Sequence, residues 1–201
     1  MRILIVNNYL PNSPQIEQLY NVIKDITVHT VEVKDYSTIS SGEEFSLFDI
    51  VILSGSQRKL AEPEVFEDYT NEVEFLKGTD KPVIGICFGH QLLAMAFGEH
   101  IVSTGKMLEG YYMVRQIEKD KLFDGLGEKF LVMESHEERL DGVPYNFLKL
   151  ADSPNCPVEA MKHEILPLYG VQFHAERFDD KHPAGGVILD NFFKIASLYV
   201  E

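Results

Sequence analysis

The sequence predicts an α/β fold in which an open, mostly parallel sheet carries helices on both faces and antiparallel additions in its C-terminal half. First, apolar runs alternate with helix-like segments over the first half of the chain. Second, short strand-like runs follow one another after Gly98 without a helical pattern between them. Third, 201 residues with 45% hydrophobic side chains suit one sizeable core, so we expect a single domain over residues 1–201.

The parallel strands are expected at four short runs rich in Ile, Leu and Val, at residues 3–6, 26–33, 50–53 and 83–86. Helices are predicted between them at residues 15–23 and 64–76, which makes the order that of βαβ units. Ligand sites of open α/β sheets form outside the carboxyl ends of the strands. We therefore expect the loops at Asn7-Asn8 and Ser54-Gly55-Ser56 to meet Cys87 at one crevice.

Cys87 stands between two glycines at the point where the fourth strand is expected to give way to a helix. A side chain at the apex of such a turn has a cramped backbone, which only tiny neighbours like Gly85 and Gly89 tolerate. The helix predicted at residues 91–97 places Cys87 near a helix N-terminus, which favours thiolate over thiol. A nucleophile is therefore one interpretation of Cys87, and a structural cysteine in a glycine-rich turn is the other.

The C-terminal half is predicted to contain short strands in mixed or antiparallel pairing, at residues 111–117, 129–133, 147–151, 158–162 and 168–173. A final helix is expected over residues 187–199, because apolar side chains recur there at helical spacing.

The net charge of −14 argues against binding to a nucleic-acid backbone or an anionic membrane, because both would repel the chain. The two cysteines, Cys87 and Cys156, form no disulfide framework and have no neighbours at metal-ligand spacing. We expect no metal and no cofactor, and a reducing cytoplasm fits this cysteine usage. The N-terminal apolar run is too short for a signal peptide, and no segment approaches a membrane span.

A thiolate that attacks a carbonyl needs a base and a third group to orient that base. The strand at residues 168–173 would deliver His174 at its end, and Glu176 follows on the same side of an extended chain. A solvated surface pair is the alternative reading of these two residues. The remaining histidines outside residues 134–138 are expected to be packed, for His90, or solvated, for His29, His100, His163 and His182.

The chain resembles the class I, or triad-type, glutamine amidotransferases almost from end to end. The likeness is carried by residues 49–55, 85–91, 134–136, 156–163 and 169–176. A narrower likeness, carried mostly by residues 156–174, is to the free-standing glutaminase subunits of archaeal GMP synthetases. The resemblance implies a flavodoxin-like sheet and hydrolysis of glutamine to glutamate and ammonia through a γ-glutamyl thioester.

The resemblance also implies roles for single residues. Cys87 would be the nucleophile, His174 the general base and then the acid for the departing ammonia, and Glu176 the orienting group. The Phe88 N–H would donate to the oxyanion, with a second donor from the loop that contains Gly55 and Ser56. Residues that would bind the substrate are Gln91 on the elbow helix and the segment Ser135, His136, Glu137 and Glu138.

The sequence departs from the family pattern at three places. The oxyanion loop reads Ser54-Gly55-Ser56-Gln57 where the family usually has Ser-Gly-Gly-Pro, so Ser56 would be strained if that position needs a positive φ. Ala175 replaces the proline usually found between the catalytic histidine and glutamate. Glu138 replaces a shorter aspartate, and the longer side chain would alter docking to a synthetase.

The leading functional hypothesis is a glutaminase that supplies ammonia to a separate synthetase of the ATP-pyrophosphatase type, because the chain has no room for such a domain of its own. GMP synthetase is the first candidate for that partner, ahead of synthetases for anthranilate or carbamoyl phosphate. The enzymatic alternative is a free-standing γ-glutamyl hydrolase or peptidase. The non-enzymatic alternative is a regulatory homologue whose oxyanion loop has decayed.

Overall fold

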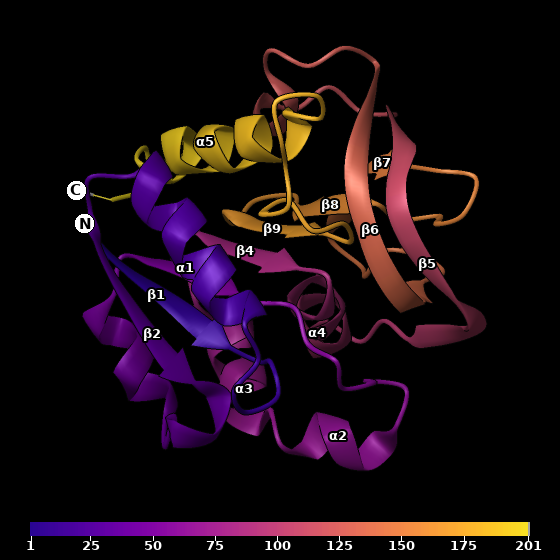
Figure 1. Cartoon of the computed structure of the whole chain (residues 1–201). Coiled ribbons are helices and arrows are strands. Elements are labelled where there is room, and N and C mark those ends of the chain that lie inside the picture. Colours follow the sequence, from indigo (N-terminus) through magenta and orange to yellow (C-terminus); the bar gives the residue numbers. More distant parts are fainter. Residues whose placement is uncertain (201) are drawn as a thin grey trace.

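The computed structural model describes residues 1–200, and within them nine strands form one sheet in the order β2-β1-β3-β4-β9-β8-β7-β5-β6. Pairing is parallel from β2 to β9 and antiparallel from β9 to β6. The predicted α/β fold, with a parallel N-terminal half and antiparallel additions, is therefore confirmed (Figure 1).

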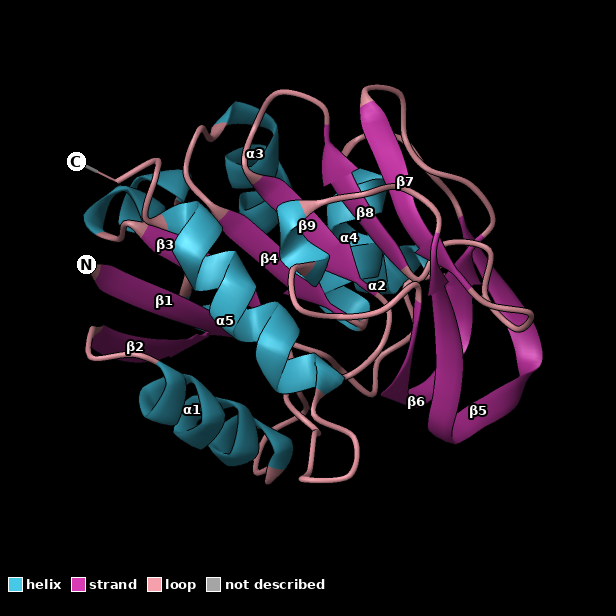
Figure 2. Cartoon of the chain, turned by 90° about the horizontal axis from the view of Figure 1, so that it is seen from above, coloured by secondary structure: helices cyan, strands magenta, loops and turns pink. Residues whose placement is uncertain are grey.

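The parallel strands are β1 (Arg2–Asn7), β2 (Thr30–Asp35), β3 (Ile50–Leu53), β4 (Val83–Ile86) and β9 (Leu168–Val171). Successive side chains of a strand point to opposite faces of the sheet, so β1 contributes side chains to the hydrophobic cores on both faces. Ile3 and Ile5 pack with α1 (Gln15–Ile26) and α5 (Ala184–Ala196). Leu4 and Val6 pack on the other face with α3 (Thr70–Gly78) and α4 (Phe88–Ala96). Figure 2 shows these two helical layers with the sheet between them.

The antiparallel part consists of β5 (Ile101–Gln116), β6 (Lys129–Leu140), β7 (Phe147–Asp152) and β8 (Ala160–His163). β5 and β6 pair over most of their length as a long ribbon at one end of the sheet (Figure 1). On β6, partly buried and fully buried side chains alternate, and the buried set faces the interior of the protein. The remaining short elements are α2 (Pro63–Glu67) and the 3₁₀ segments η1 (Tyr36–Thr38), η2 (Gly42–Leu47) and η3 (Lys121–Phe123).

Two element boundaries in the N-terminal half differ from the predictions for local reasons. The strand expected at residues 26–33 begins at Thr30, because α1 continues through Ile26 and Thr27 N–H still bonds Ile23 O. The helix expected at residues 64–76 divides into α2 and α3. Tyr69 lies between them, buried and stacked on the ring of Tyr36.

In the C-terminal half, both strands of the ribbon are longer than predicted. β5 starts ten residues before residue 111, and β6 runs through residues 135–138 to Leu140, so the predicted substrate segment is a strand. The final helix lies over Ala184–Ala196 rather than 187–199. The prediction that His163 is solvated is wrong, because its ring is buried against Phe97 and Phe147.

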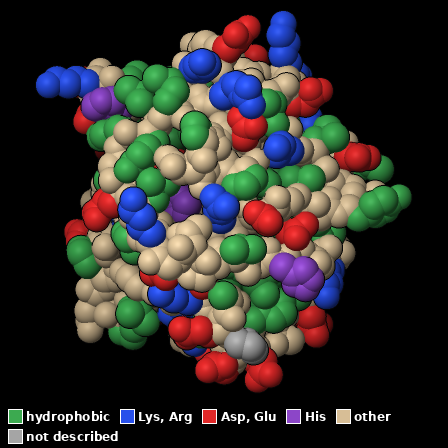
Figure 3. Space-filling model, turned by 90° about the vertical axis from the view of Figure 1, so that its right-hand side faces the viewer, with side chains coloured by type: hydrophobic (Ala, Val, Ile, Leu, Met, Phe, Trp, Pro, Cys, Tyr) green, Lys and Arg blue, Asp and Glu red, His purple; other side chains and the backbone are tan. Residues whose placement is uncertain are grey.

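The outer face of the ribbon carries mixed charges. Lys and Arg side chains alternate with Asp and Glu there, and hydrophobic side chains lie between them (Figure 3). Val102, Met107 and Met113 are among the exposed apolar residues of β5. In the described part of the chain, residues 1–200, no helix has the length and apolar character that crossing a membrane requires.

Candidate active site

Cys87 caps the N-terminus of α4 in the strained backbone conformation that its glycine neighbours predicted. Its φ is 51° and its ψ is −103°, in a region that non-glycine residues seldom occupy. A Cβ on Gly85 would lie 2.4 Å from the Gly89 carbonyl carbon, and one on Gly89 would lie 2.4 Å from Leu53 O. Cys87 N–H donates to Val171 O of β9 at 2.8 Å. Close packing and a strand-to-strand hydrogen bond thus hold the cysteine at the apex of the turn.

His174 and Glu176 follow β9 and form a buried pair, with 2.7 Å between His174 Nδ1 and Glu176 Oε1. His174 N–H also donates to Met133 O of β6 at 2.8 Å, so a second strand fixes its backbone. The Cys87 side chain also acts electrostatically on the imidazole and raises its pKa. The structure thus brings together the three residues that the sequence proposed as a triad, and both His174 and Glu176 are almost wholly buried.

The electrostatics of the pair favour a charged imidazolium. Burial acts to lower the pKa of His174, but the negative charges of Glu176 and Cys87 outweigh it and raise that pKa to about 10. Burial acts to raise the pKa of Glu176, and the positive charge of His174 outweighs it, so the net direction is down. At neutral pH a protonated His174 therefore lies between the Glu176 carboxylate and the Cys87 side chain.

Two residues without a predicted role also contact the triad. Gln172 Nε2 lies 3.7 Å from Cys87 Sγ, and the Tyr9 hydroxyl lies 3.5 Å from Glu176 Oε1. Gln172 belongs to the segment that carries His174, and Tyr9 directly follows the Asn7-Asn8 loop at the end of β1. The only sequence signal for either residue was its position at the carboxyl end of a parallel strand.

The predicted oxyanion loop follows β3 and lies over the elbow. Among residues 1–200, the non-glycine residues with positive φ are Asn12, Cys87 and Asn146, so Ser56 does not need a positive φ and the strain considered for it does not arise. The glycine that the site requires is Gly55. A Cβ there would lie 2.8 Å from the Tyr9 hydroxyl oxygen and 3.0 Å from His174 Cε1.

The elbow, the oxyanion loop and β6 enclose one pocket. Its lining includes eight of the predicted site residues: Ser56, Cys87, Phe88, Gln91, Ser135, His136, Glu137 and Glu138. Gln57, Arg58, Lys59 and Met107 complete the wall. The remaining predicted residues, Gly55, His174 and Glu176, lie on the Tyr9 side of the cysteine.

Gln91 is buried at the base of this pocket, so a helix surface position is excluded. Its Nε2 donates to Glu138 O at 2.8 Å and to Gln172 Oε1 at 3.1 Å. These two bonds tie α4 to β6 and to the segment that leads into His174.

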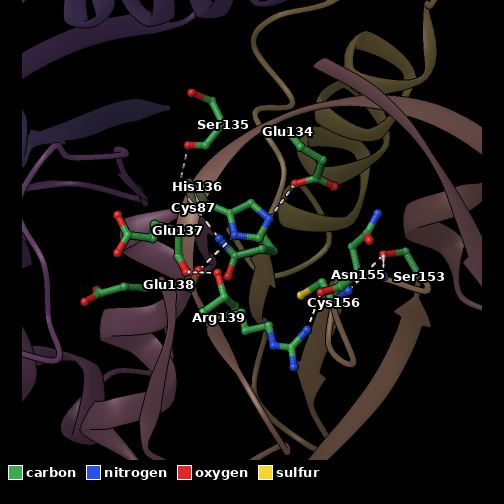
Figure 4. Close-up of polar contacts among 12 residues, drawn as sticks. Cys87, Glu134, Ser135, His136, Glu137, Glu138, Arg139, Ser153, Asn155 and Cys156 are labelled. Atoms are coloured by element: carbon green, nitrogen blue, oxygen red, sulfur yellow. Dashed lines mark hydrogen bonds and ion pairs between the residues drawn. The ribbon is translucent and has the colours of Figure 1, made fainter. Parts of the chain in front are cut away.

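Alternate residues of β6 face opposite sides of the strand at this pocket (Figure 4). The Glu137 carboxylate accepts from Lys59 Nζ at 2.9 Å on the exposed side. The Glu138 carboxylate points inward and accepts from Leu60 N–H at 2.8 Å and Ala61 N–H at 3.3 Å. The Glu138 carboxylate is thus bound to the chain's own backbone, and its effect on docking stays a prediction.

The chain is similar in sequence to proteins of a known family. The sequence model of the family "Glutamine amidotransferase class-I" matches residues 4–196. The chain is 33% identical over 201 residues to a glutamine-hydrolyzing GMP synthase subunit of Methanosarcina acetivorans, with 99% of this chain and 98% of the relative covered. It is 35% identical over 200 residues to the protein of the same name in Archaeoglobus fulgidus, with coverage of 97% and 98%.

Solved structures of similar shape agree in fold. A protein of Thermoplasma acidophilum, described as a candidate GMP synthase subunit, superposes with a TM-score of 0.86 at 24% identity, covering 99% of this chain and 95% of the other. A glutamine amidotransferase of Thermotoga maritima superposes with a TM-score of 0.78 at 16% identity, with coverage of 98% and 97%.

Proposed function

The chain belongs to the class I glutamine amidotransferases, and on that premise we propose that Cys87 releases ammonia from glutamine for a separate synthetase subunit. The observation that carries the proposal is the convergence of the strained Cys87 with the buried His174–Glu176 pair, whose Nδ1 and Oε1 atoms are 2.7 Å apart. A nucleophile, a proton carrier and an orienting carboxylate are what acyl transfer needs.

In the first step the Cys87 thiolate attacks the side-chain carbonyl carbon of glutamine. Negative charge develops on the carbonyl oxygen, and N–H groups at Phe88 and in the Gly55–Ser56 loop donate to it. The protonated His174 then gives its proton to the departing nitrogen, so that ammonia leaves and a thioester remains.

In the second step His174 accepts a proton from water, which attacks the thioester and releases glutamate. Glu176 stabilises the imidazolium form before and after each transfer, consistent with the raised pKa of His174. Because the Glu176 side chain is buried, water does not compete with His174 for its carboxylate.

We assign recognition of glutamine to the pocket between the elbow helix and β6. Gln91 contacts the substrate side chain, and the Ser135–Glu138 segment holds the amino-acid end. The supporting observation is that all five residues line one pocket with Cys87.

The partner that we propose is an ATP-pyrophosphatase subunit of the GMP synthetase type. In support, relatives named as glutamine-hydrolyzing GMP synthase subunits match this chain over nearly their whole length. Both cysteines are free, which fits the reducing cytoplasm in which we expect this enzyme to work.

The test is release of ammonia from glutamine by the chain alone and with a recombinant ATP-pyrophosphatase subunit of GMP synthetase, ATP and xanthosine monophosphate. We expect the full mixture to accelerate release and the Cys87→Ala variant to abolish it. Equal activity of Cys87→Ala would overturn the catalytic assignment. Rapid hydrolysis of γ-glutamyl peptides, with no response to the partner, would support a free-standing γ-glutamyl hydrolase instead.

A further inference from the structure

Three ionisable side chains lie together at the substrate pocket: His136 lines it, whereas Glu134 and Glu159 have no part in the proposed mechanism. Glu134 and His136 project from the inner face of β6 (Figure 4). Glu159 directly precedes β8. Glu134 and Glu159 have no exposed surface, and His136 is 6% exposed. Burying an ionisable group costs free energy unless a partner neutralises its charge. The protonation states of these three side chains must therefore compensate one another.

The contacts of His136 determine where two hydrogen atoms must lie. Its Nδ1 is 2.9 Å from Glu138 O, and a carbonyl oxygen only accepts, so Nδ1 carries a hydrogen. Its Nε2 is 3.0 Å from Glu134 Oε2, so a single proton occupies the space between these atoms, whichever of them holds it.

The two carboxyl groups need a further proton. Glu134 and Glu159 influence each other's pKa, and, apart from the His136 contact, none of their four buried carboxylate oxygens has a hydrogen-bond partner while both groups are ionised, because ionised carboxylates only accept. Burial is the first cause that raises the pKa of both groups. One shared proton between them therefore accompanies the proton shared with His136.

The charged and titratable groups around these three side chains interact with other partners. His174 pairs with Glu176 and Cys87, and Arg139 donates to Asn155 O and lies 4.0 Å from Asp141. Burial raises the pKa of the Cys156 thiol, whose Sγ donates to Val158 O. Ser153, whose hydroxyl oxygen accepts from two backbone N–H groups, is a neutral neighbour of Glu159.

We propose that Glu134, Glu159 and His136 form an electrically neutral network that holds two shared protons and positions β6 for catalysis. Two arrangements satisfy the contacts: both glutamates protonated beside a neutral imidazole, or one glutamate ionised beside an imidazolium. Both arrangements have zero net charge. Loss of either proton leaves a net negative charge buried under the pocket.

The network acts through the backbone of the strand that carries it. Met133 O accepts from His174 N–H at 2.8 Å, and Ser135 O lies 4.0 Å from Cys87 Sγ. Glu138 O accepts from both His136 Nδ1 and Gln91 Nε2. The three buried residues are thus positioning residues for the triad and for the glutamine pocket, a consequence that rests on the proposed function.

The proton count is tested by unfolding alone, which needs no enzymatic activity. Gln in place of Glu134 accepts the Glu159 hydrogen and donates to Nε2, so Glu134→Gln preserves the contacts with one titrating proton fewer. An unfolded glutamate ionises near pH 4.3, whereas buried Glu134 retains its proton to higher pH. The wild-type protein therefore loses stability relative to Glu134→Gln as pH rises.

The measurement is the ratio of the unfolding constants of wild type and Glu134→Gln from denaturant titrations at pH 5, 6 and 7. We expect the ratio to rise about tenfold per pH unit, because unfolding of the wild type releases one more proton. The matched control is Glu128→Gln, an exposed glutamate next to β6, for which the ratio to wild type stays constant. A constant ratio for Glu134→Gln as well would overturn the proposed network.

The positioning role is tested by glutamine hydrolysis. Glu134→Ala leaves Glu159 and His136 without their shared partner, and we expect the KM for glutamine to rise at least tenfold. Glu134→Gln should restore KM to within about threefold of wild type at pH 6. Equal KM values for Glu134→Ala and wild type, or equal impairment of both variants, would overturn the role. An inactive wild-type protein would contradict the proposed function, while the unfolding ratio would still decide the proton network.

Discussion

The Glu138 carboxylate accepts a hydrogen bond from Leu60 N–H at 2.8 Å, and this contact joins the loop after the oxyanion segment to the wall of the substrate pocket. Burial acts to raise the pKa of Glu138, and the backbone donors and Lys59 only partly offset it. The Glu138 side chain thereby holds two elements that both line the pocket, the loop after Ser56 and strand β6.

Replacement of Glu138 by Gln should slow glutamine hydrolysis. A bond from a backbone N–H to a charged acceptor contributes about 1.5–3 kcal/mol, so we expect kcat to fall roughly tenfold as the loop loosens. Hydrogen exchange of the Leu60 amide should accelerate in the same variant. Asp141→Asn, at the exposed end of the strand, is the control. If kcat and the hydrogen exchange of the Leu60 amide were both unchanged in Glu138→Gln, the hydrogen bond from Leu60 N–H to Glu138 would not hold the loop.

The two cysteines should differ in reactivity. Cys87 lines the pocket and contacts His174, whereas Cys156 has no exposed surface and burial raises the pKa of its thiol. We expect a glutamine-derived chloroketone to modify Cys87 at least 100-fold faster than Cys156, measured by peptide mass spectrometry. His174→Ala should slow the labelling of Cys87. Equal labelling of both thiols would mean that the elbow does not activate its cysteine.

Gly55→Ala should damage activity more than stability. The added methyl group would press on the ends of two side chains, at 2.8 Å from the Tyr9 hydroxyl and 3.0 Å from His174 Cε1. A shift of about 1 Å in a catalytic group costs roughly 100-fold in rate, so kcat should fall by about that factor. Gly78→Ala, with no atom within 4 Å of its Cβ, is the matched control and should keep its activity. Loss of folding in Gly55→Ala, seen by circular dichroism, would contradict this prediction.

Glu72 should reduce stability at alkaline pH. It is buried in α3 beside Asn8, and burial raises its pKa to about 8. A glutamate whose folded-state pKa is raised stabilises the fold fully below pH 4.3, and that contribution is lost as pH rises toward 8. Glu72→Gln should therefore raise the free energy of unfolding at pH 8 by roughly 3–5 kcal/mol and change it little at pH 4. Glu74→Gln, exposed on the same helix, is the control, and an equal effect of both at pH 8 would refute the assignment.

Much of the fold was predictable because its causes are local. Apolar runs marked the buried parallel strands, and a Cβ at Gly85 or Gly89 would overlap neighbouring backbone, so the elbow around Cys87 follows from the sequence itself. Element boundaries were less predictable. β6 continues through residues 135–138 because it pairs with β5, a partner more than twenty residues away.

The sequence by itself determined the α/β order and the nucleophile turn at Cys87. These depend on side-chain periodicity and on backbone sterics over a few residues, which the sequence states directly. The tertiary structure alone decided that Ser56 has no positive φ, that Glu138 binds the backbone at Leu60, and that Glu134 and Glu159 are fully buried. Those outcomes depend on hydrogen-bond partners and burial contributed by distant strands, and no local pattern encodes them.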